Sequence, residues 1–168
     1  MNMHEQLLAL AAELGAVLKA RNNKLALAES CTGGMASQYI TAIAGSSVWF
    51  DRSFITYSNA AKIDMLQVSP VTLEKFGAVS EETAGEMTIG ALSNSDATIT
   101  ASIAGIAGPD GGSTEKPVGT VCFAVCSKSA ADLPMVISKT QRFIGNREEI
   151  RMQSVKFIFQ QLLISASA

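Results

Sequence analysis

Short apolar runs alternate with helical segments along the whole chain, and this alternation limits its possible folds more than any other feature. The runs that predict strands are apolar or rich in β-branched residues, and they occupy 24–29, 48–57, 97–104, 120–126 and 135–143. Helices are predicted between and around them, over 4–20, 35–43, 60–67, 80–92 and the stretch after Asn146. Strands interleaved with helices, with two successive strands late in the chain, predict the α/β class and a three-layer α/β/α sandwich around a mixed sheet.

Capping residues set the expected starts of the later helices. Asn59 is predicted to cap the helix over 60–67, because its short side chain can accept a hydrogen bond from the first turn. Pro70 is predicted to end that stretch. Ser80 and Asn146 are predicted to cap the helices that follow them, where acidic residues in the first turn suit the helix dipole.

Length and composition bound the domain count and the partners. The 168 residues predict one domain over 1–168 that buries about two thirds of its unfolded surface. A formal net charge of -2 provides no basic surface for nucleic acid or anionic lipid, and no apolar run approaches the roughly 18 residues of a membrane span. Because only 17% of the residues are charged, we expect a homodimer or a higher homo-oligomer.

The N-terminus and the cysteines predict a cytoplasmic protein. The first residues have neither the basic region nor the small-residue cleavage site of a signal peptide. The odd count of 3 cysteines indicates a reducing compartment. Cys122 and Cys126 lie four positions apart in a predicted strand, which separates them by roughly 13 Å and excludes a disulfide between them.

The scarcity of histidine excludes several kinds of active site. The chain has 1 histidine, His4, which lies near a chain end and is poorly placed for catalysis. A Ser-His-Asp triad, a Cys-His pair and a zinc site with several histidines are therefore excluded, and we expect no metal and no cofactor. A general base near neutral pH has to be Lys, Asp, Glu or Tyr.

A hydroxyl group follows the first predicted strand. Ser30 stands where the run 24–29 ends, and the glycines at 33 and 34 lead into a helix. A serine at such a position is exposed at the edge of the sheet, near backbone N–H groups that can bind an oxyanion. Capping of the helix by Ser30 or Thr32 is an equally good explanation of the same residues. Cys31 is a rival nucleophile, but no histidine is present to activate it.

A lysine opens the third predicted helix. Lys62 lies at the third position after Asn59, where a helix N-terminus and partial burial both lower a lysine pKa. Serine and lysine can then replace serine and histidine in acyl transfer, and Tyr57 could relay a proton or bond to one of them. The alternative is a strand-end tyrosine and a solvated lysine.

A long glycine-rich loop precedes the fourth predicted strand. Loops of this length are usually functional, and the residues that could surround an anion with backbone amides are Gly105, Ala107, Gly108, Gly111 and Gly112. The segment has no GK[ST] ending, so it is not a Walker phosphate loop, and a plain connection stays an alternative. Arg147 and Arg151 share one face of the last helix, where they could bind a phosphate or pair with acids such as Glu148.

Several long motifs together resemble one family over nearly the whole chain. They are AESCTGG at 28–34, ITAIAGSSVWF at 40–50, YSNAAK at 57–62, GAVSEETA at 77–84, SIAGIAGPDGG at 102–112 and KPVGTV at 116–121. In this order they resemble the CinA C-terminal domain family, whose stand-alone members are nicotinamide-nucleotide amidohydrolases. The resemblance implies a mixed, mostly parallel five-stranded sheet between helical layers.

The resemblance also implies an activity and a set of site residues. The activity is hydrolysis of nicotinamide mononucleotide to nicotinic acid mononucleotide and ammonia, in the recycling of pyridine nucleotides. The catalytic serine, tyrosine and lysine of the family fall on Ser30, Tyr57 and Lys62. The residues expected to bind the substrate are Cys31, Thr32, Gly33, Gly34, Asn59, Gly105, Ala107, Gly108, Gly111, Gly112 and Arg147.

Two other functions are consistent with the same residues. A nucleotide-binding sensor of the same fold could keep the pocket without turnover, although a pure binder needs no Ser30, Tyr57 and Lys62 together. Redox or thiol chemistry at Cys31 would require an activity that is lost on removal of that thiol.

Overall fold

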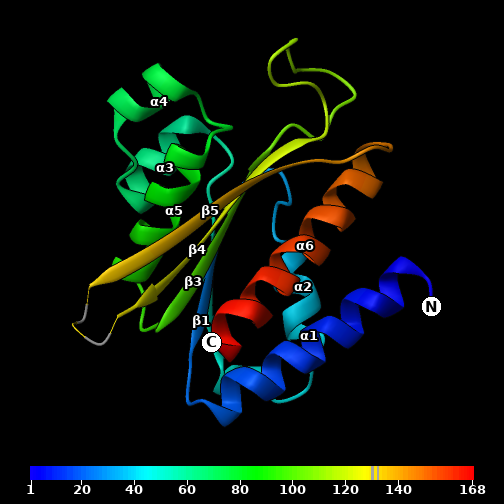
Figure 1. Ribbon diagram of the computed structural model, residues 1–168, viewed down its shortest axis with the longest axis vertical. Coiled ribbons are helices and arrows are strands. Elements are labelled where there is room, and N and C mark those ends of the chain that lie inside the picture. Colours follow the sequence, from blue (N-terminus) through cyan, green and yellow to red (C-terminus); the bar gives the residue numbers. More distant parts are fainter. Residues whose placement is uncertain (130, 132) are drawn as a thin grey trace.

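The computed structural model of the protein describes residues 1–129, 131 and 133–168 (Figure 1). Its helices are α1 (Met3–Ala20), α2 (Met35–Thr41), α3 (Asn59–Leu66), α4 (Pro70–Phe76), α5 (Glu81–Ser93) and α6 (Arg147–Ser167), with a short 3-10 helix, η1, at Ser46–Val48. Its strands are β1 (Leu25–Glu29), β2 (Phe50–Ile55), β3 (Ile99–Gly105), β4 (Thr120–Lys128) and β5 (Pro134–Arg142). All five strands lie close to their predicted positions, with helices between and around them.

Within the described residues, the strands form one 5-stranded sheet in the order β2-β1-β3-β4-β5. β1 pairs in parallel with β2 and with β3, whereas β4 is antiparallel to both of its neighbours. All strands except β4 therefore run in the same direction, which confirms the mixed and mostly parallel sheet. The hairpin β4–β5 is the reason for the mixed character.

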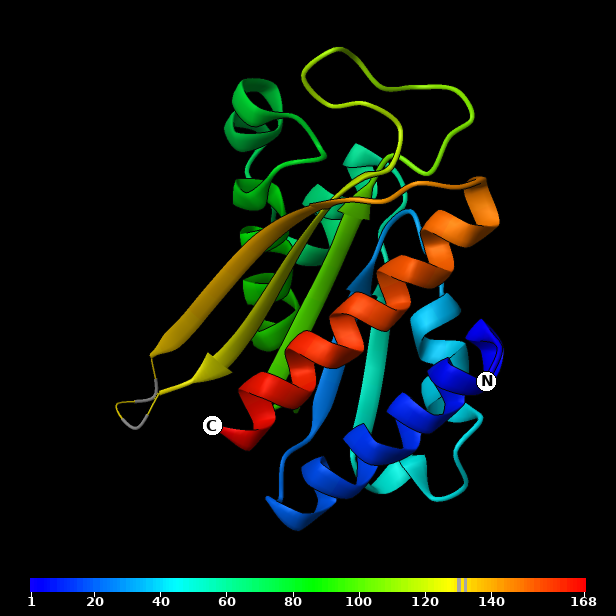
Figure 2. The same cartoon turned by 45° about the vertical axis from the view of Figure 1, so that its right-hand side comes forward.

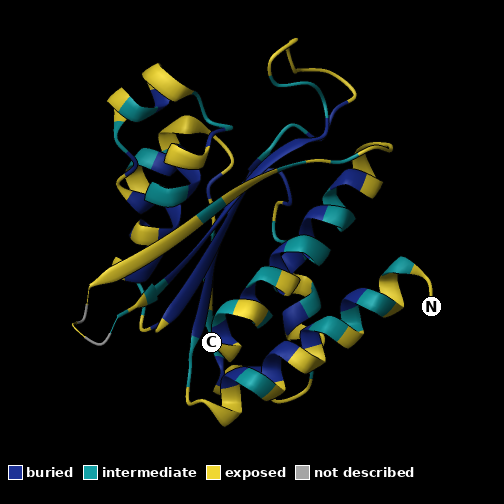
Figure 3. Ribbon diagram, viewed as in Figure 1, coloured by how far each residue is buried: buried dark blue, intermediate teal, exposed yellow. Residues whose placement is uncertain are grey.

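Helices cover both faces of this sheet. Helix α5 packs on β3, β4 and β5, with α3 and α4 against it, while α6 packs on β3 and β4 on the other face and carries α1 on its flank (Figure 2). The three inner strands β1, β3 and β4 are buried along most of their length, in contrast to the edge strands β2 and β5 (Figure 3). The three-layer α/β/α sandwich is confirmed. No helix in the described part of the chain has the length and apolar character to cross a membrane.

The two faces of β3 explain how one strand serves both layers. Ile99, Ala101 and Ile103 belong to the core shared with α1 and α6. On the opposite face, the hydroxyl of Thr100 donates to the carbonyl of Thr88 (2.8 Å), and that of Ser102 donates to the carbonyl of Ala84 (2.6 Å). These hydroxyls are fully buried, and α5 satisfies their hydrogen bonds. The polar face of β3 therefore packs against a helix and does not face water.

The second strand and the third helix begin at other residues than the sequence predicted. The expected strand 48–57 is shortened to Phe50–Ile55, because η1 occupies Ser46–Val48. The cap of α3 is Ser58, not Asn59: the Ser58 hydroxyl accepts from the N–H of Ala61, and Asn59 is the first helical residue. Two adjacent polar residues can each cap a helix, and the extended backbone at Ser58 decides between them.

The region around Pro70 contains a helix that the sequence analysis did not predict. Helix α3 ends at Leu66, followed by Gln67 in the left-handed conformation. Pro70 then begins α4, where Ser69 caps the helix and accepts from the N–H of Val71. A proline ends a preceding helix but also suits the first position of the next one, because that N–H needs no partner.

Substitution by alanine should have opposite effects on stability at two glycines of α5. A Cβ at Gly90 would lie 2.0 Å from the carbonyl oxygen of Leu66, because the end of α3 packs directly on the α5 backbone. We expect Gly90→Ala to lower the free energy of unfolding by about 1–3 kcal/mol, measured by urea denaturation. The matched control is Gly85→Ala, whose Cβ would meet its nearest neighbour at 3.7 Å; it should raise stability by about 0.5–1 kcal/mol. Equal effects of the two substitutions would contradict this account of the α3–α5 contact.

Candidate active site

The turn after β1 is organised by Glu29, a residue that the sequence analysis did not single out. Its fully buried carboxylate accepts hydrogen bonds from the N–H groups of Gly34 (3.0 Å), Ala36 (3.1 Å) and Ser37 (3.0 Å). It also accepts from the hydroxyls of Thr32 (2.7 Å) and Ser37 (2.5 Å). Glu29 therefore satisfies the first turn of α2, whose N-cap Gly34 has no side chain to do so.

This arrangement shows which of the two hydroxyls, those of Ser30 and Thr32, supports the turn and which is free for a catalytic role. Thr32 is buried and bonded to Glu29, so its side chain helps to hold the turn. The Ser30 hydroxyl is left for another partner. A glutamate directly before a serine and a glycine-rich helix start is the sequence signal that could have identified the anchor.

Arg151 holds the other side of the same turn. Its guanidinium donates from Nε to the carbonyl of Cys31 (3.1 Å) and from Nη2 to the carbonyl of Thr32 (2.9 Å). Pairing of Arg151 with an acid, one of the alternatives from the sequence, is therefore not its role in this structure. The first turns of α6 lie beside the turn that links β1 to α2 (Figure 2).

Lys62 is brought to Ser30 from α3, although 32 positions separate the two residues. The Lys62 Nζ lies 3.1 Å from Ser30 Oγ, 2.8 Å from the carbonyl of Thr56 and 3.3 Å from the carbonyl of Tyr57. Only 1% of the Lys62 surface is exposed. Burial lowers the pKa of the Lys62 amine, which favours the neutral form that can accept a proton. The solvated lysine considered as an alternative is excluded by this position.

Tyr57 contributes two groups to the site, its backbone carbonyl and its hydroxyl. Its backbone carbonyl accepts from Lys62, whereas its hydroxyl accepts from Arg147 Nη2 at 3.1 Å. Tyr57 is 61% exposed and is one of the residues that line the cavity. Arg147 also donates from Nη1 to the carbonyl of Gly108 (2.7 Å), which ties the first turn of α6 to the glycine-rich loop.

Cys31 lies beside Ser30 but has the protonation state of an inert thiol. Burial raises its pKa to about 11, with a partial opposing effect from Arg151. The thiolate is therefore scarce at neutral pH, and it is the thiolate that acts as nucleophile or redox centre. This argues against the thiol chemistry considered as an alternative.

A cavity of about 180 Å³ contains the Ser30–Lys62 pair. Its lining residues are Ser30, Cys31, Tyr57, Asn59, Lys62, Ala78, Val79, Ala104, Gly105, Ala107 and Arg147. All three expected catalytic residues and five of the expected binding residues are in this set. Ala78, Val79 and Ala104 were not expected, although Ala78 and Val79 belong to the motif at 77–84 and Ala104 to the motif at 102–112.

The remaining expected binding residues lie outside the cavity lining. Thr32, Gly33 and Gly34 form the turn beneath Ser30, where the N–H of Gly33 donates to the carbonyl of Ser30 at 3.0 Å. Gly108 contributes the carbonyl that holds Arg147. Gly111 and Gly112 are exposed in the distal part of the loop. A Cβ at Gly112 would lie 2.9 Å from the N atom of Val118, so the loop itself needs a glycine there.

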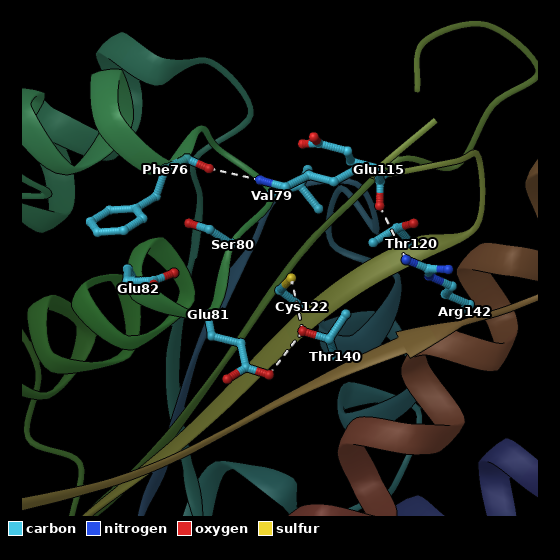
Figure 4. A pocket seen from close by; sticks show the side chains of 11 residues that line it. Phe76, Val79, Ser80, Glu81, Glu82, Glu115, Thr120, Cys122, Thr140 and Arg142 are labelled. Carbon is cyan, nitrogen blue, oxygen red and sulfur yellow. Dashed lines mark hydrogen bonds between the residues drawn. The ribbon is translucent and has the colours of Figure 1, made fainter. Parts of the chain in front are cut away.

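A larger hollow of about 380 Å³ shares Val79 with this cavity, and several of its polar groups are engaged in structural contacts (Figure 4). The Cys122 thiol lies 3.5 Å from the Thr140 hydroxyl, which donates to Glu81 at 2.9 Å. Lys116 donates to the carbonyl of Phe76 at 2.7 Å. The smaller cavity, which holds a serine against a buried amine, is therefore the candidate active site. Among the described residues, no group of three or more His, Cys, Asp or Glu could hold a metal ion.

Comparison with known proteins agrees with this architecture and supplies a family. Residues 7–165 match the model of the CinA C-terminal domain. The chain is 51% identical over 154 residues to the nicotinamide-nucleotide amidohydrolase PncC of Enterobacter agglomerans, covering 92% of each chain. It is 48% identical over 157 residues to the protein of the same name from Escherichia coli K12, covering 94% of this chain and 93% of that one.

Solved structures show the same fold. The competence/damage inducible protein CihA from Agrobacterium tumefaciens superposes with a TM-score of 0.88 at 40% identity, covering 97% of this chain and 96% of that one. A competence-damaged protein (CinA) superfamily protein from Klebsiella pneumoniae superposes with a TM-score of 0.89 at 35% identity, covering 99% of each chain. The motifs, the sheet topology and these matches together place the chain in the CinA C-terminal domain family.

Proposed function

We propose that this chain hydrolyses the carboxamide of nicotinamide mononucleotide to nicotinic acid mononucleotide and ammonia, and so recycles pyridine nucleotides. The observation that carries the proposal is the 3.1 Å contact between Lys62 Nζ and Ser30 Oγ in a cavity. This pair can form and hydrolyse an acyl-enzyme, which is what amide hydrolysis requires. The substrate follows from the similarity to nicotinamide-nucleotide amidohydrolases over more than nine tenths of the chain.

The first half of the reaction forms an ester on Ser30. Neutral Lys62 takes the hydroxyl proton as Ser30 Oγ attacks the carboxamide carbon, and the carbonyl oxygen becomes an oxyanion. The N–H groups of Cys31 and Thr32 stabilise this oxyanion. The Lys62 ammonium then returns its proton to the amide nitrogen, the C–N bond breaks, and ammonia leaves.

The second half releases the acid. Lys62, again neutral, takes a proton from a water molecule whose oxygen attacks the ester carbon. The bond to Ser30 Oγ breaks, the serine recovers its proton from Lys62, and nicotinic acid mononucleotide is released. These steps use only groups of this chain and water.

The residues around the cavity orient the nucleotide in this proposal. Arg147 contacts the phosphate, supported by Tyr57 and by the loop that contains Gly105, Ala107 and Gly108. Binding energy from that remote group holds the carboxamide against Ser30. The Tyr57 carbonyl, which accepts from Lys62 at 3.3 Å, orients the amine of the general base.

We also propose that the enzyme acts in the cytoplasm as a homodimer or a higher homo-oligomer. All three cysteines are free, which agrees with a reducing compartment. The edge strand β5 exposes Met135 and Ile137, 57% of each, which agrees with a surface that another copy covers.

The nucleophile and its base are tested by ammonia release from nicotinamide mononucleotide without added metal. We expect Ser30→Ala and Lys62→Met each to lower kcat by at least about 1,000-fold, because neither an ester nor its activation is possible without these groups. Cys31→Ala should keep substantial turnover, since its thiol takes no chemical step. Loss of activity in Cys31→Ala with retention in Ser30→Ala would favour thiol chemistry. A folded wild-type protein that binds the nucleotide without turnover would favour the sensor.

The lowered pKa of Lys62 predicts the direction of the pH dependence. Protonated Lys62 cannot accept the Ser30 proton, so kcat/KM should be low at acid pH and rise as the amine loses its proton. Because burial lowers this pKa, the midpoint of the rise should lie below the ordinary pKa of lysine. The measurement is kcat/KM for nicotinamide mononucleotide over the pH range in which the fold is stable. A rate that falls as the pH rises would rule out Lys62 as the base.

A further inference from the structure

We propose that Arg151 is a positioning residue that orients and strengthens the two backbone donors of the oxyanion site; this rests on the function proposed above. The guanidinium does not line the cavity, so it acts through the turn between β1 and α2. It is bound to two consecutive carbonyls of that turn, those of Cys31 and Thr32, across 120 and 119 positions of the chain.

The contact with Cys31 acts on the N–H of Thr32. The Cys31 carbonyl and the Thr32 N–H belong to one planar trans peptide group, so they point in opposite directions. A cationic donor on the carbonyl oxygen therefore turns the N–H away from Arg151. It also draws electron density toward the oxygen, which makes the N–H a stronger donor.

The contact with Thr32 acts on the N–H of Cys31 through one more hydrogen bond. The Thr32 carbonyl shares its peptide group with the N–H of Gly33, and this N–H donates to the carbonyl of Ser30 at 3.0 Å. The Ser30 carbonyl in turn shares its peptide group with the N–H of Cys31. The charge of Arg151 thus polarises a chain of two peptide groups that ends at Cys31.

The two N–H groups at the ends of these chains are the ones available to a ligand. The N–H of Gly33 is bonded to Ser30 and that of Gly34 to Glu29. Those of Cys31 and Thr32 donate to no other residue in the described part of the chain. Glu29 and Arg151 therefore engage the rest of the turn and leave two donors beside the nucleophile.

This role predicts that Arg151 supports the tetrahedral state and not the bound substrate. We expect Arg151→Met to lower kcat for nicotinamide mononucleotide by about 10- to 100-fold, less than the loss of a direct oxyanion donor. The dissociation constant of the nucleotide, measured by calorimetry in a Ser30→Ala background that prevents turnover, should change by less than about twofold.

An aldehyde analogue separates this role from a merely structural one. A nucleotide with an aldehyde in place of the carboxamide forms a tetrahedral adduct with Ser30, whose oxygen occupies the oxyanion site. Arg151→Met should weaken inhibition by this analogue by about the same factor as it lowers kcat. General loosening of the site would instead weaken the substrate and the analogue equally.

Arg21 offers a matched control. It also donates to two consecutive backbone oxygens, those of Ser167 and of Ala168, the last residue, and it does not line the cavity. Arg21→Met should leave kcat and analogue inhibition unchanged. If Arg151→Met does not fold, Arg151→Lys is measured instead. Lysine keeps the positive charge but lacks the planar guanidinium group that reaches both carbonyls, so kcat should fall by about tenfold.

Three outcomes would overturn the inference. The first is a kcat within about twofold of wild type in the folded Met or Lys variant. The second is a raised dissociation constant for the nucleotide at unchanged kcat, which would make Arg151 a phosphate ligand. The third is equal weakening of substrate and analogue. A wild-type enzyme without turnover would refute the proposed function itself, which the wild-type assay reveals before any variant is compared.

Discussion

The hydrogen bonding of the buried Glu29 carboxylate is the constraint on which the rest of the site depends. A carboxylate without access to water is tolerated only when its oxygens are satisfied, and here the first turn of α2 and the hydroxyls of Thr32, Ser37 and Ser53 provide the donors. The same contacts satisfy N–H groups that a helix start otherwise leaves without partners. Because Glu29 takes the capping role, the hydroxyl of Ser30 is left to face Lys62.

A second constraint is the burial of the Lys62 amine. A lysine amine with 1% exposure costs solvation energy, and the cost falls when the amine is neutral. The carbonyls of Thr56 and Tyr57 accept its hydrogens and hold it against Ser30. The short helix α3 can lie directly against α5 because Gly90 has no side chain to separate it from Leu66, the last residue of α3. The burial that makes Lys62 a base is thus produced by the packing of α3, α5 and the sheet.

The local patterns predicted the elements better than their ends. The alternation over 97–104 identified both faces of β3, and the capping residues Ser80 and Asn146 start α5 and α6 as expected. The prediction for α3 was wrong at its cap because Ser58 and Asn59 are both capable side chains, and backbone conformation chooses between them. The short helix α4 was missed because Pro70 was interpreted only as a stop.

The sequence by itself determined the α/β class, the family motifs, the position of Ser30 after a strand and the exclusion of histidine-based catalysis, since these follow from local patterns and residue counts. Only the tertiary structure decided that Lys62 meets Ser30 across 32 positions and that Arg151 reaches the carbonyl of Cys31 across 120. The physical reason is that these contacts depend on the strand order β2-β1-β3 and on the packing of α3 and α6, which local periodicity does not encode. Glu29 lay within a recognised motif, yet its role became visible only when its burial and its donors were known.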